Sequence, residues 1–225
     1  STTYRFYVDM QDATDRMSAV FGNDQSSLIV NTPAGAFSSM FNASWNASGI
    51  NAAFLPMVPD LADDSYATIN LDGPASTSTI AGAADPSLVE DTDLAVKVTD
   101  YFITGGSGLN VNTLTGASWY VLNTAGNALP DANNRWLIAQ ITTTGSISGQ
   151  INYQVFPLGV GADQAQLSVE FDGAGTFGGG GGGNACGCTD DTAVNYDASA
   201  QYDDGSCEYD VLGCTDEMAC NYNGD

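Results

Sequence analysis

Residues 146–157 read SISGQINYQVFP. Single polar residues separate the apolar side chains of Ile151, Tyr153 and Val155 in this stretch. Such period-two alternation is typical of a β-strand with one face packed on a core and the other face in water. The stretch therefore predicts a half-buried strand.

The strand has a neighbour immediately before it in the chain. Residues 135–142 form a second β-rich run, and only Thr143-Thr144-Gly145 separates it from residues 146–157. A short glycine-containing loop between two such runs is typical of a β-hairpin. We therefore expect these two strands to pair with each other.

Alternating runs recur along residues 1–172, and dense Gly, Pro, Asn and Ser punctuation leaves no amphipathic helix longer than two turns. Runs of this kind occur at residues 4–8, 94–98 and 167–172. About ten short strands in a chain of this length indicate an all-β domain built as a two-sheet sandwich. Trp45, Trp119 and Trp136 are expected in the core or at its rim.

The composition limits the partners that the chain can have. The 225 residues carry 27 Asp and Glu against 4 Lys and Arg, with no His, which gives a formal net charge of -23. This charge repels nucleic acid and anionic membranes and attracts cations, although it also serves solubility in salty surroundings. No apolar run approaches the roughly 20 residues of a membrane helix. We expect neither nucleic-acid binding nor membrane insertion.

The residue types also argue against an enzyme. Without His, neither a Ser-His-Asp nor a Cys-His constellation can form. The glycine-rich stretch 105–108 lacks the Lys and the following helix of a phosphate-binding loop. Two alternatives stay open: a glycan hydrolase that uses two carboxylates, and a carbohydrate-binding module that uses aromatic and amide side chains on a β face.

A glycine-rich segment separates the β domain from the rest of the chain. Residues 173–184 include six consecutive glycines, 178–183. Such a run behaves as a flexible linker, although glycine also permits a strand that passes close to another backbone.

All the cysteines lie beyond this segment, in a short acidic tail. So short a segment cannot bury enough apolar surface to fold by itself, which favours disulfides formed in an oxidising compartment. Zinc is the alternative, but the spacing gives no pair of C-x-x-C knuckles. The number is odd, so one cysteine is free or pairs elsewhere. The five are Cys186, Cys188, Cys207, Cys214 and Cys220.

An internal repeat organises the tail. The sequence GCTD at 187–190 returns at 213–216, and A-x-N-Y at 193–196 returns at 219–222. The period is 26 residues, and DDGSC closes the first copy at 203–207. We divide the tail into a first repeat at 185–212 and the start of a second at 213–225. We expect further repeats to follow, because the second copy stops before its closing motif.

Cys188 and Cys207 bracket the first repeat and are expected to form a disulfide. A closed loop of about twenty residues stabilises the folded state by about 3 kcal/mol through loop-closure entropy. Cys186 lies two residues away and could replace Cys188; otherwise it pairs with Cys214 or Cys220.

The repeats are rich in the hard oxygen donors that calcium prefers, six to eight of which surround each ion. A divalent ion would offset the repulsion between these carboxylates and stabilise a segment without a core. A solvated acidic loop is the alternative. The candidate ligands are Asp190, Asn195, Asp197, Asp203 and Asp204 in the first copy and Asp216, Asn221 and Asn223 in the second.

The β domain carries weaker candidate sites. Two acidic groups could bind calcium in loops or simply be polar loops, and two tandem sequons could carry glycans in a eukaryotic source. The acidic groups are Asp60, Asp63 and Asp64 with Asp72, and Glu90, Asp91 and Asp93; the sequons begin at Asn42 and Asn46.

The order Gly-Cys-Thr-Asp, Ala-x-Asn-Tyr-Asp and Asp-Asp-Gly-Ser-Cys resembles the acidic repeats of large secreted bacterial surface proteins, which are similar in kind to thrombospondin type 3 calcium repeats. The resemblance covers residues 187–225. Residues 44–51 and 63–69 resemble the N-terminal domains that accompany such repeats. One departure is Val194, where many copies have Cys, which puts the disulfide connectivity of individual copies in doubt.

The resemblance implies an extracellular adhesive or structural protein, and it supplies no catalytic residues. We therefore expect a secreted, cell-surface protein in which a β-sandwich head is carried on a calcium-stiffened stalk, possessing no enzymatic activity. The chain starts at Ser1 without Met, as a mature secreted protein does and as any trimmed sequence also does. Expected partners are calcium, further copies of the chain in a homo-oligomer or fibre, and a surface glycan or protein.

Overall fold

The chain forms two compact units, Ser1–Phe177 and Gly178–Asp225. The computed structural model describes residues 1–10, 12–178, 185–188, 190–194, 196, 200–203 and 207–209. The predicted linker spans this boundary: residues 173–177 belong to the first unit, whereas residues 179–184 lie outside the described part of the chain.

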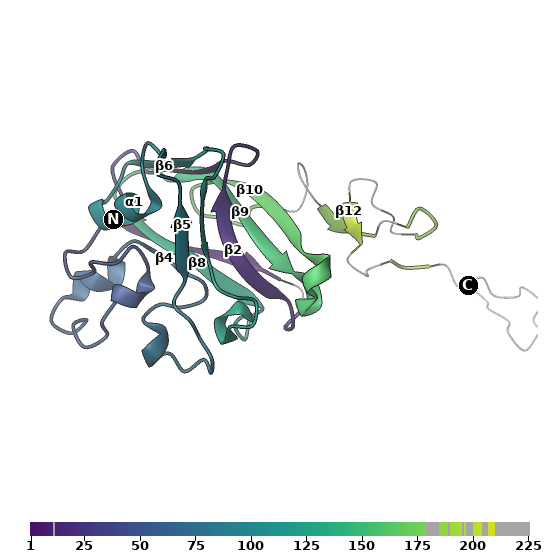
Figure 1. Cartoon of the computed structure of the whole chain (residues 1–225), viewed down its shortest axis with the longest axis horizontal. Helices are drawn as coiled ribbons and strands as arrows, with labels where there is room; N and C mark the ends of the chain where they lie inside the picture. The colour runs from purple at the N-terminus through teal and green to yellow at the C-terminus, as the bar shows by residue number, and fades with distance from the viewer. Residues whose placement is uncertain are drawn as a thin grey trace, which may run out of the picture. The chain divides into compact units, whose positions relative to one another are not determined.

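The first unit is an all-β domain, as the sequence predicts. Its described residues form ten strands, one short α-helix and several turns of 3-10 helix (Figure 1). The strands are β1 (Thr2–Asp9), β2 (Arg16–Gly22), β3 (Leu28–Asn31), β4 (Tyr66–Ala67), β5 (Ser87–Glu90), β6 (Gly108–Val111), β7 (Ala117–Tyr120), β8 (Arg135–Thr143), β9 (Ser148–Phe156) and β10 (Ala165–Asp172). The helix is α1 (Val98–Thr104), and the 3-10 turns are η1 (Ala47–Gly49), η2 (Pro59–Asp63), η3 (Ala75–Thr77), η4 (Gly126–Ala128), η5 (Pro157–Gly159) and η6 (Gly161–Asp163).

The strands make two antiparallel sheets. The smaller sheet has the order β1-β8-β4, and the larger has the order β5-β7-β2-β9-β3-β6, with β10 paired to β9. The long strand β9 pairs with β2 and β3 in turn, and with β10 over residues 148–155.

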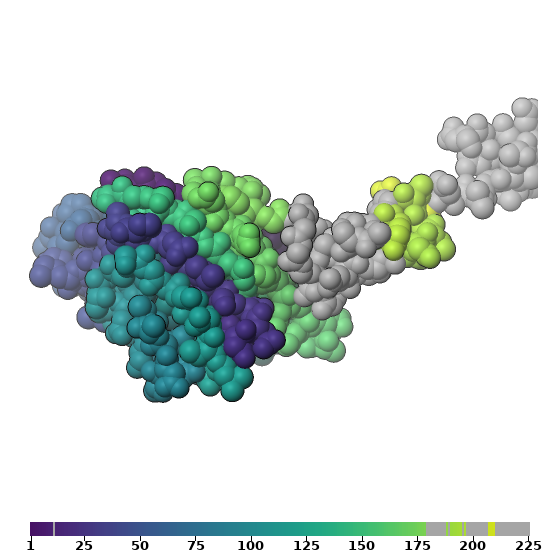
Figure 2. All heavy atoms as spheres, turned by 90° about the horizontal axis from the view of Figure 1, so that it is seen from above, coloured from purple at the N-terminus to yellow at the C-terminus, as the bar shows by residue number. Residues whose placement is uncertain are grey.

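The two sheets share one core, so the unit is a sandwich. The Trp119 Nε1 on β7 donates a hydrogen bond to the Ile138 carbonyl on β8, 3.3 Å away. The Phe6 ring on β1 meets the Phe171 ring on β10 edge to face, with centroids 5.0 Å apart. Trp119 and Trp136 are buried in this core and Trp45 packs against it, as the sequence predicts. Figure 2 shows N-terminal and later segments of this unit, in purple and green, side by side in one packed body.

The predicted hairpin is wrong, because β8 and β9 belong to different sheets. Eight of the nine residues of β8 are buried, so both of its faces are covered, and β1 and β4 flank it on its two edges. The loop after β8 carries the chain across the sandwich, and Ile147 within it is fully buried.

The strand predicted over residues 94–98 is also wrong. Val98, Tyr101 and Phe102 are buried together, at the i, i+3 and i+4 spacing of a helix, and form the inner side of α1. Gly105 ends the helix in the left-handed conformation, with φ of 77°.

A second, smaller core covers the outer side of β8. It consists of Ala47, Ile50, Leu61 and Tyr66. Gln140 on β8 anchors the covering segment, because its Nε2 donates to the carbonyls of Ala62 at 2.9 Å and Asp64 at 2.8 Å. This satisfies a polar side chain that is buried within the structure.

In the second unit, the described residues include two short parallel strands, β11 (Ala185–Gly187) and β12 (Ala200–Asp203). The Val194 amide donates to the Glu208 carbonyl at 2.8 Å, and Cys188 forms an isolated bridge with Tyr196. The second repeat, 213–225, lies outside the described residues.

Candidate functional site

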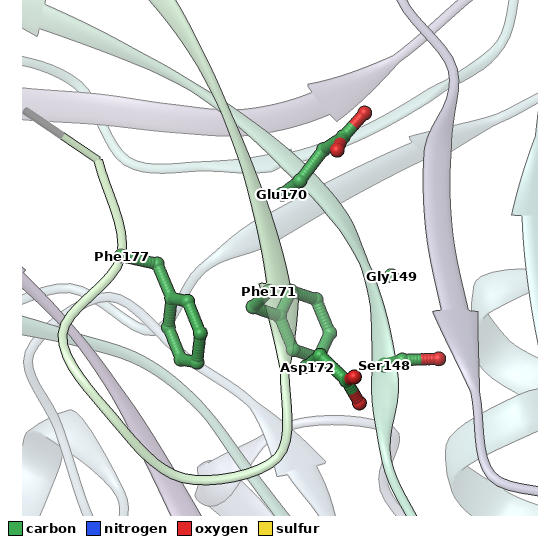
Figure 3. Close-up of a pocket in the computed structure, with 6 residues that line it drawn as sticks. All are labelled: Ser148, Gly149, Glu170, Phe171, Asp172 and Phe177. Carbon is green, nitrogen blue, oxygen red and sulfur yellow. The ribbon is translucent and has the colours of Figure 1, made fainter. Parts of the chain in front are cut away.

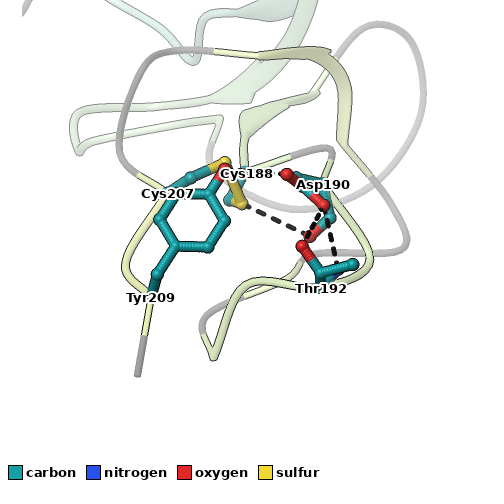
Figure 4. Close-up of a disulfide and its surroundings, with 5 residues drawn as sticks. All are labelled: Cys188, Asp190, Thr192, Cys207 and Tyr209. Carbon is teal, nitrogen blue, oxygen red and sulfur yellow. Dashed lines mark hydrogen bonds between the residues drawn. A yellow bond between two sulfur atoms is a disulfide. The ribbon is translucent and has the colours of Figure 1, made fainter. Parts of the chain in front are cut away.

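The first repeat is closed by a disulfide between Cys188 and Cys207 (Figure 4). This is the pairing predicted from the sequence, and it joins residues 19 positions apart. Cys188 is almost fully buried. The side chain of Cys186 and the whole of Cys214 and Cys220 lie outside the described part of the chain.

Asp190 holds the loop next to this disulfide. Its Oδ1 accepts hydrogen bonds from the Thr192 amide at 2.9 Å and the Thr192 hydroxyl at 2.7 Å. Its Oδ2 accepts from the Tyr209 hydroxyl at 2.7 Å. The bonds from Thr192, and then the one from Tyr209, lower the pKa of the Asp190 carboxyl, so this group is a carboxylate at neutral pH.

The structure describes the side chain of no other predicted calcium ligand. Asp203 lies in β12, where only the backbone is described. Among the described residues no group of three His, Cys, Asp or Glu is placed to hold a metal ion. The remaining candidates, Asn195, Asp197, Asp204, Asp216, Asn221 and Asn223, lie outside the described residues.

The donors of the repeat nevertheless fit calcium chemically. They are carboxylate and amide oxygens with no imidazole among them, and Asp190 is an ionised member of the set. Its three hydrogen bonds show a further role, since they fix the turn at 190–192 and tie it to Tyr209 beyond the disulfide.

The first acidic group of the β unit is divided among separate structural roles. Asp72 lies 4.0 Å from the Arg5 guanidinium, and the Asp63 Oδ1 accepts from the Thr3 hydroxyl at 3.1 Å. Asp64 points inward and is 1% exposed. These carboxylates do not converge on one point.

Asp64 belongs to a buried polar network. Its Oδ1 accepts from the Ser39 amide at 2.6 Å, and its Oδ2 accepts from the Asn42 Nδ2 at 2.7 Å. Burial raises the pKa of the Asp64 carboxyl, although these hydrogen bonds act against the rise. A raised carboxyl pKa can mark an acid catalyst, but a group this buried cannot reach a substrate in this structure.

The second acidic group orders α1 and the turn before it. Both Glu90 carboxylate oxygens accept hydrogen bonds from Thr99, one from its hydroxyl and one from its amide, in the first turn of the helix. The Asp91 Oδ1 accepts from the Asp93 amide at 3.1 Å. Both arrangements are ones that acidic residues commonly adopt at helix starts and turns.

The two sequon asparagines are buried and serve the same network as Asp64. Asn42 is 4% and Asn46 5% exposed. The Asn46 Nδ2 donates to the Pro86 carbonyl at 3.3 Å, and its Oδ1 accepts from the Ser48 amide at 2.9 Å. A glycan attached to either nitrogen would break these bonds in the folded domain.

Burial limits which aromatic residues could contact a glycan. Trp119 and Trp136 are buried, so they cannot stack on a sugar. Tyr120 and Phe21 are half-buried in β7 and β2 of the larger sheet, and Asn152 on β9 stands opposite Phe21. Sequence reasoning predicted one wet face of β9 but missed Tyr120, because no pattern in the sequence shows which strands stand beside one another.

The unit also has a shallow hollow of about 450 Å³ beside the edge strand β10 (Figure 3). The Phe177 and Phe171 rings lie side by side there, with centroids 6.5 Å apart, which binds the end of the first unit to its core. The hollow is lined by Ser148, Gly149, Glu170, Phe171, Asp172 and Phe177.

No family model matches this chain, and no curated protein or solved structure shows significant similarity to it. Among the described residues, no helix is long and apolar enough to cross a membrane.

Proposed function

We propose that this protein is an extracellular structural or adhesive protein, in which the β-sandwich head is carried on acidic repeats that calcium stiffens. The observation that carries the proposal is the first repeat itself. It belongs to a compact unit separate from the head, and a disulfide closes it. Disulfides persist in oxidising surroundings, which supports a secreted, surface-associated protein.

Calcium would act on the stalk through the oxygen-rich loops of each repeat. Asp190, Asp203 and Asp204 with Asn195 and Asp197 would supply ligands in the first copy. Asp190 also holds the turn that presents its neighbours. Binding would neutralise carboxylates that otherwise repel one another, and a chain of such repeats would extend the head away from the surface.

We further propose that several copies assemble on the cell surface, as subunits of a fibre or appendage, and that the head performs binding rather than catalysis. The pKa of the buried Asp64 carboxyl is raised. This carboxylate already accepts hydrogen bonds from Ser39 and Asn42. This supports a structural role for Asp64.

Antibody labelling of intact source cells, followed by electron microscopy with and without a calcium chelator, tests the proposal. We expect surface labelling on structures that hold the label at a uniform distance from the cell in calcium and at variable distances in the chelator. Labelling that requires permeabilised cells would refute it.

A further inference from the structure

The register of the larger sheet builds one continuous outer face. Its inner face carries core residues such as Val20 and Trp119, which stand opposite each other on β2 and β7. Because successive side chains of a strand point to opposite faces, the residues next to these point outward. Two rows of directly opposed residues therefore cross β5, β7, β2, β9 and β10: Ser87, Tyr120, Ala19, Gln154 and Gln166 in the first, and Val89, Ser118, Phe21, Asn152 and Ser168 in the second. We call these the outer rows.

The amides of the first row are held in place. The Gln166 Nε2 donates to the Gln154 Oε1 at 3.2 Å, and the Gln154 Nε2 donates to the Ser18 hydroxyl at 3.3 Å. Ser18 lies at the register shift between Met17 and Ala19, where an extra residue in β2 brings its side chain beside the row. Such fixed donors and acceptors lose little conformational freedom when a ligand binds.

One loop borders the second row. The Asn152 Nδ2 donates to the carbonyls of Phe21 at 3.1 Å and Ser26 at 2.9 Å, so the loop after β2 covers this amide. Asn152 is therefore fully buried. The accessible part is thus centred on Tyr120, Gln154 and the exposed Gln166.

The outer rows are free of charge in a very acidic chain. None of their ten residues is Asp, Glu, Lys or Arg, whereas the whole chain has a net charge of -23. The field of such a chain disfavours an anionic ligand at any of its faces. The rows offer amides that donate and accept, hydroxyls and one phenol ring, but few large apolar side chains for the core of a protein interface.

We propose that the outer rows bind a neutral polysaccharide, with the Tyr120 ring stacked on a sugar and Gln154 and Gln166 bonded to its hydroxyls. Four strand spacings of about 4.8 Å give each row a length of about 19 Å, enough for a short run of sugars. This inference rests on the proposed adhesive function, because it names the ligand that the head would hold.

The test uses the full chain in native gels containing soluble β-1,3-glucan, xylan or dextran, and in pull-downs with cellulose and chitin. We expect at least one neutral polymer to retain the protein and anionic polygalacturonate not to retain it. Tyr120→Ala should weaken retention about tenfold, as removal of a central aromatic contact does. Gln166→Glu, an isosteric change at an exposed position, should weaken it as well without affecting the fold.

Two matched variants control for general effects. Tyr7→Ala removes a half-exposed tyrosine from the smaller sheet, and Asn133→Ala removes an exposed amide side chain from the turn before β8. Both should bind as the unchanged protein does. The proposal falls if none of these neutral polymers retains the chain, or if Tyr120→Ala and Gln166→Glu both bind normally. It also falls if the outer rows instead mediate self-association that Gln166→Glu abolishes.

Surface labelling and the calcium response of the repeats are measured on the same preparations. If both persist while every polysaccharide fails, the proposed function stands and only this ligand is wrong. If the chain is not at the cell surface but still binds a glycan through Tyr120, the proposed function fails while the binding face stands.

Discussion

Asp64 shows how one buried residue organises a segment without regular secondary structure. Its carboxylate accepts from Ser39 and Asn42, while Gln140 donates to its backbone carbonyl. The sequence placed Asp64 in an acidic loop, because three other Asp residues surround it within twelve positions. Its burial could not be predicted, since the partners that satisfy it are as many as 76 residues away.

Replacement of Asp64 by Ala should lower the free energy of unfolding by about 1–3 kcal/mol at pH 7, because the Ser39 amide and Asn42 Nδ2 lose their buried acceptor. Urea unfolding of the full chain measures this. Thr77→Ala, at an exposed hydroxyl, serves as the control. An unchanged midpoint for Asp64→Ala would contradict the assigned role.

The raised pKa of Asp64 gives a second, pH-dependent expectation. The folded state binds a proton at Asp64 more readily than the unfolded state, so ionisation of this group opposes folding as pH rises through the raised pKa. The stability of the unchanged protein relative to Asp64→Asn should therefore increase as pH falls from 7 towards 4. Urea unfolding of both proteins across this range tests it, and a constant difference would contradict it.

At the scale of elements, local pattern predicted the strands better than their partners. The alternation over β1, β9 and β10 is correct because each has one face on the core. The pairing of β8 with β9 is wrong because a short loop can either turn back within a sheet or cross between sheets. The outer rows were unpredictable for the same reason, since β5, β7, β2 and β9 come from distant parts of the chain.

The disulfide is the element that supports the first repeat. Changing Cys188 and Cys207 together to Ser should remove about 3 kcal/mol of loop-closure stabilisation from the second unit. We expect faster proteolysis and faster amide exchange in residues 185–209, with the thermal midpoint of the β unit unchanged. Non-reducing peptide mapping of the unchanged protein should recover the Cys188–Cys207 pair. A pairing of Cys186 with Cys207 in solution would contradict the structure.

For the whole molecule, the residue types predict binding without catalysis. The chain has no His, and the one described carboxyl whose pKa is raised, that of Asp64, is buried. We expect no hydrolysis of glycan, ester or peptide substrates by the full chain. The polymers used in the binding test provide the glycan substrates. Turnover that disappears when a single Asp or Glu is changed would contradict this expectation and show that the chain has a catalytic carboxyl group.

The proposed stalk function depends on how the acidic tail responds to calcium. Residues 184–225 contain many carboxylates and neither Lys nor Arg, so we expect electrostatic repulsion to loosen this segment when no cation is bound. Micromolar to millimolar calcium should compact it, with the affinity depending on site charge and rigidity. Small-angle scattering and calorimetry of the full chain measure the change in radius and the heat of binding.

Replacing Asp203 and Asp204 by Ala should remove most of the calcium response and leave the thermal midpoint of the β unit unchanged, because the two units are separately compact. Asp24→Ala together with Asp163→Ala, which removes two exposed carboxylates from the β unit, controls for net charge. Asp190→Ala should weaken the response even if Asp190 does not touch the ion, since its bonds to Thr192 hold the loop. An unchanged radius and no heat at about 10 mM calcium, beyond the weak end of known calcium sites, would make the tail a plain acidic tether.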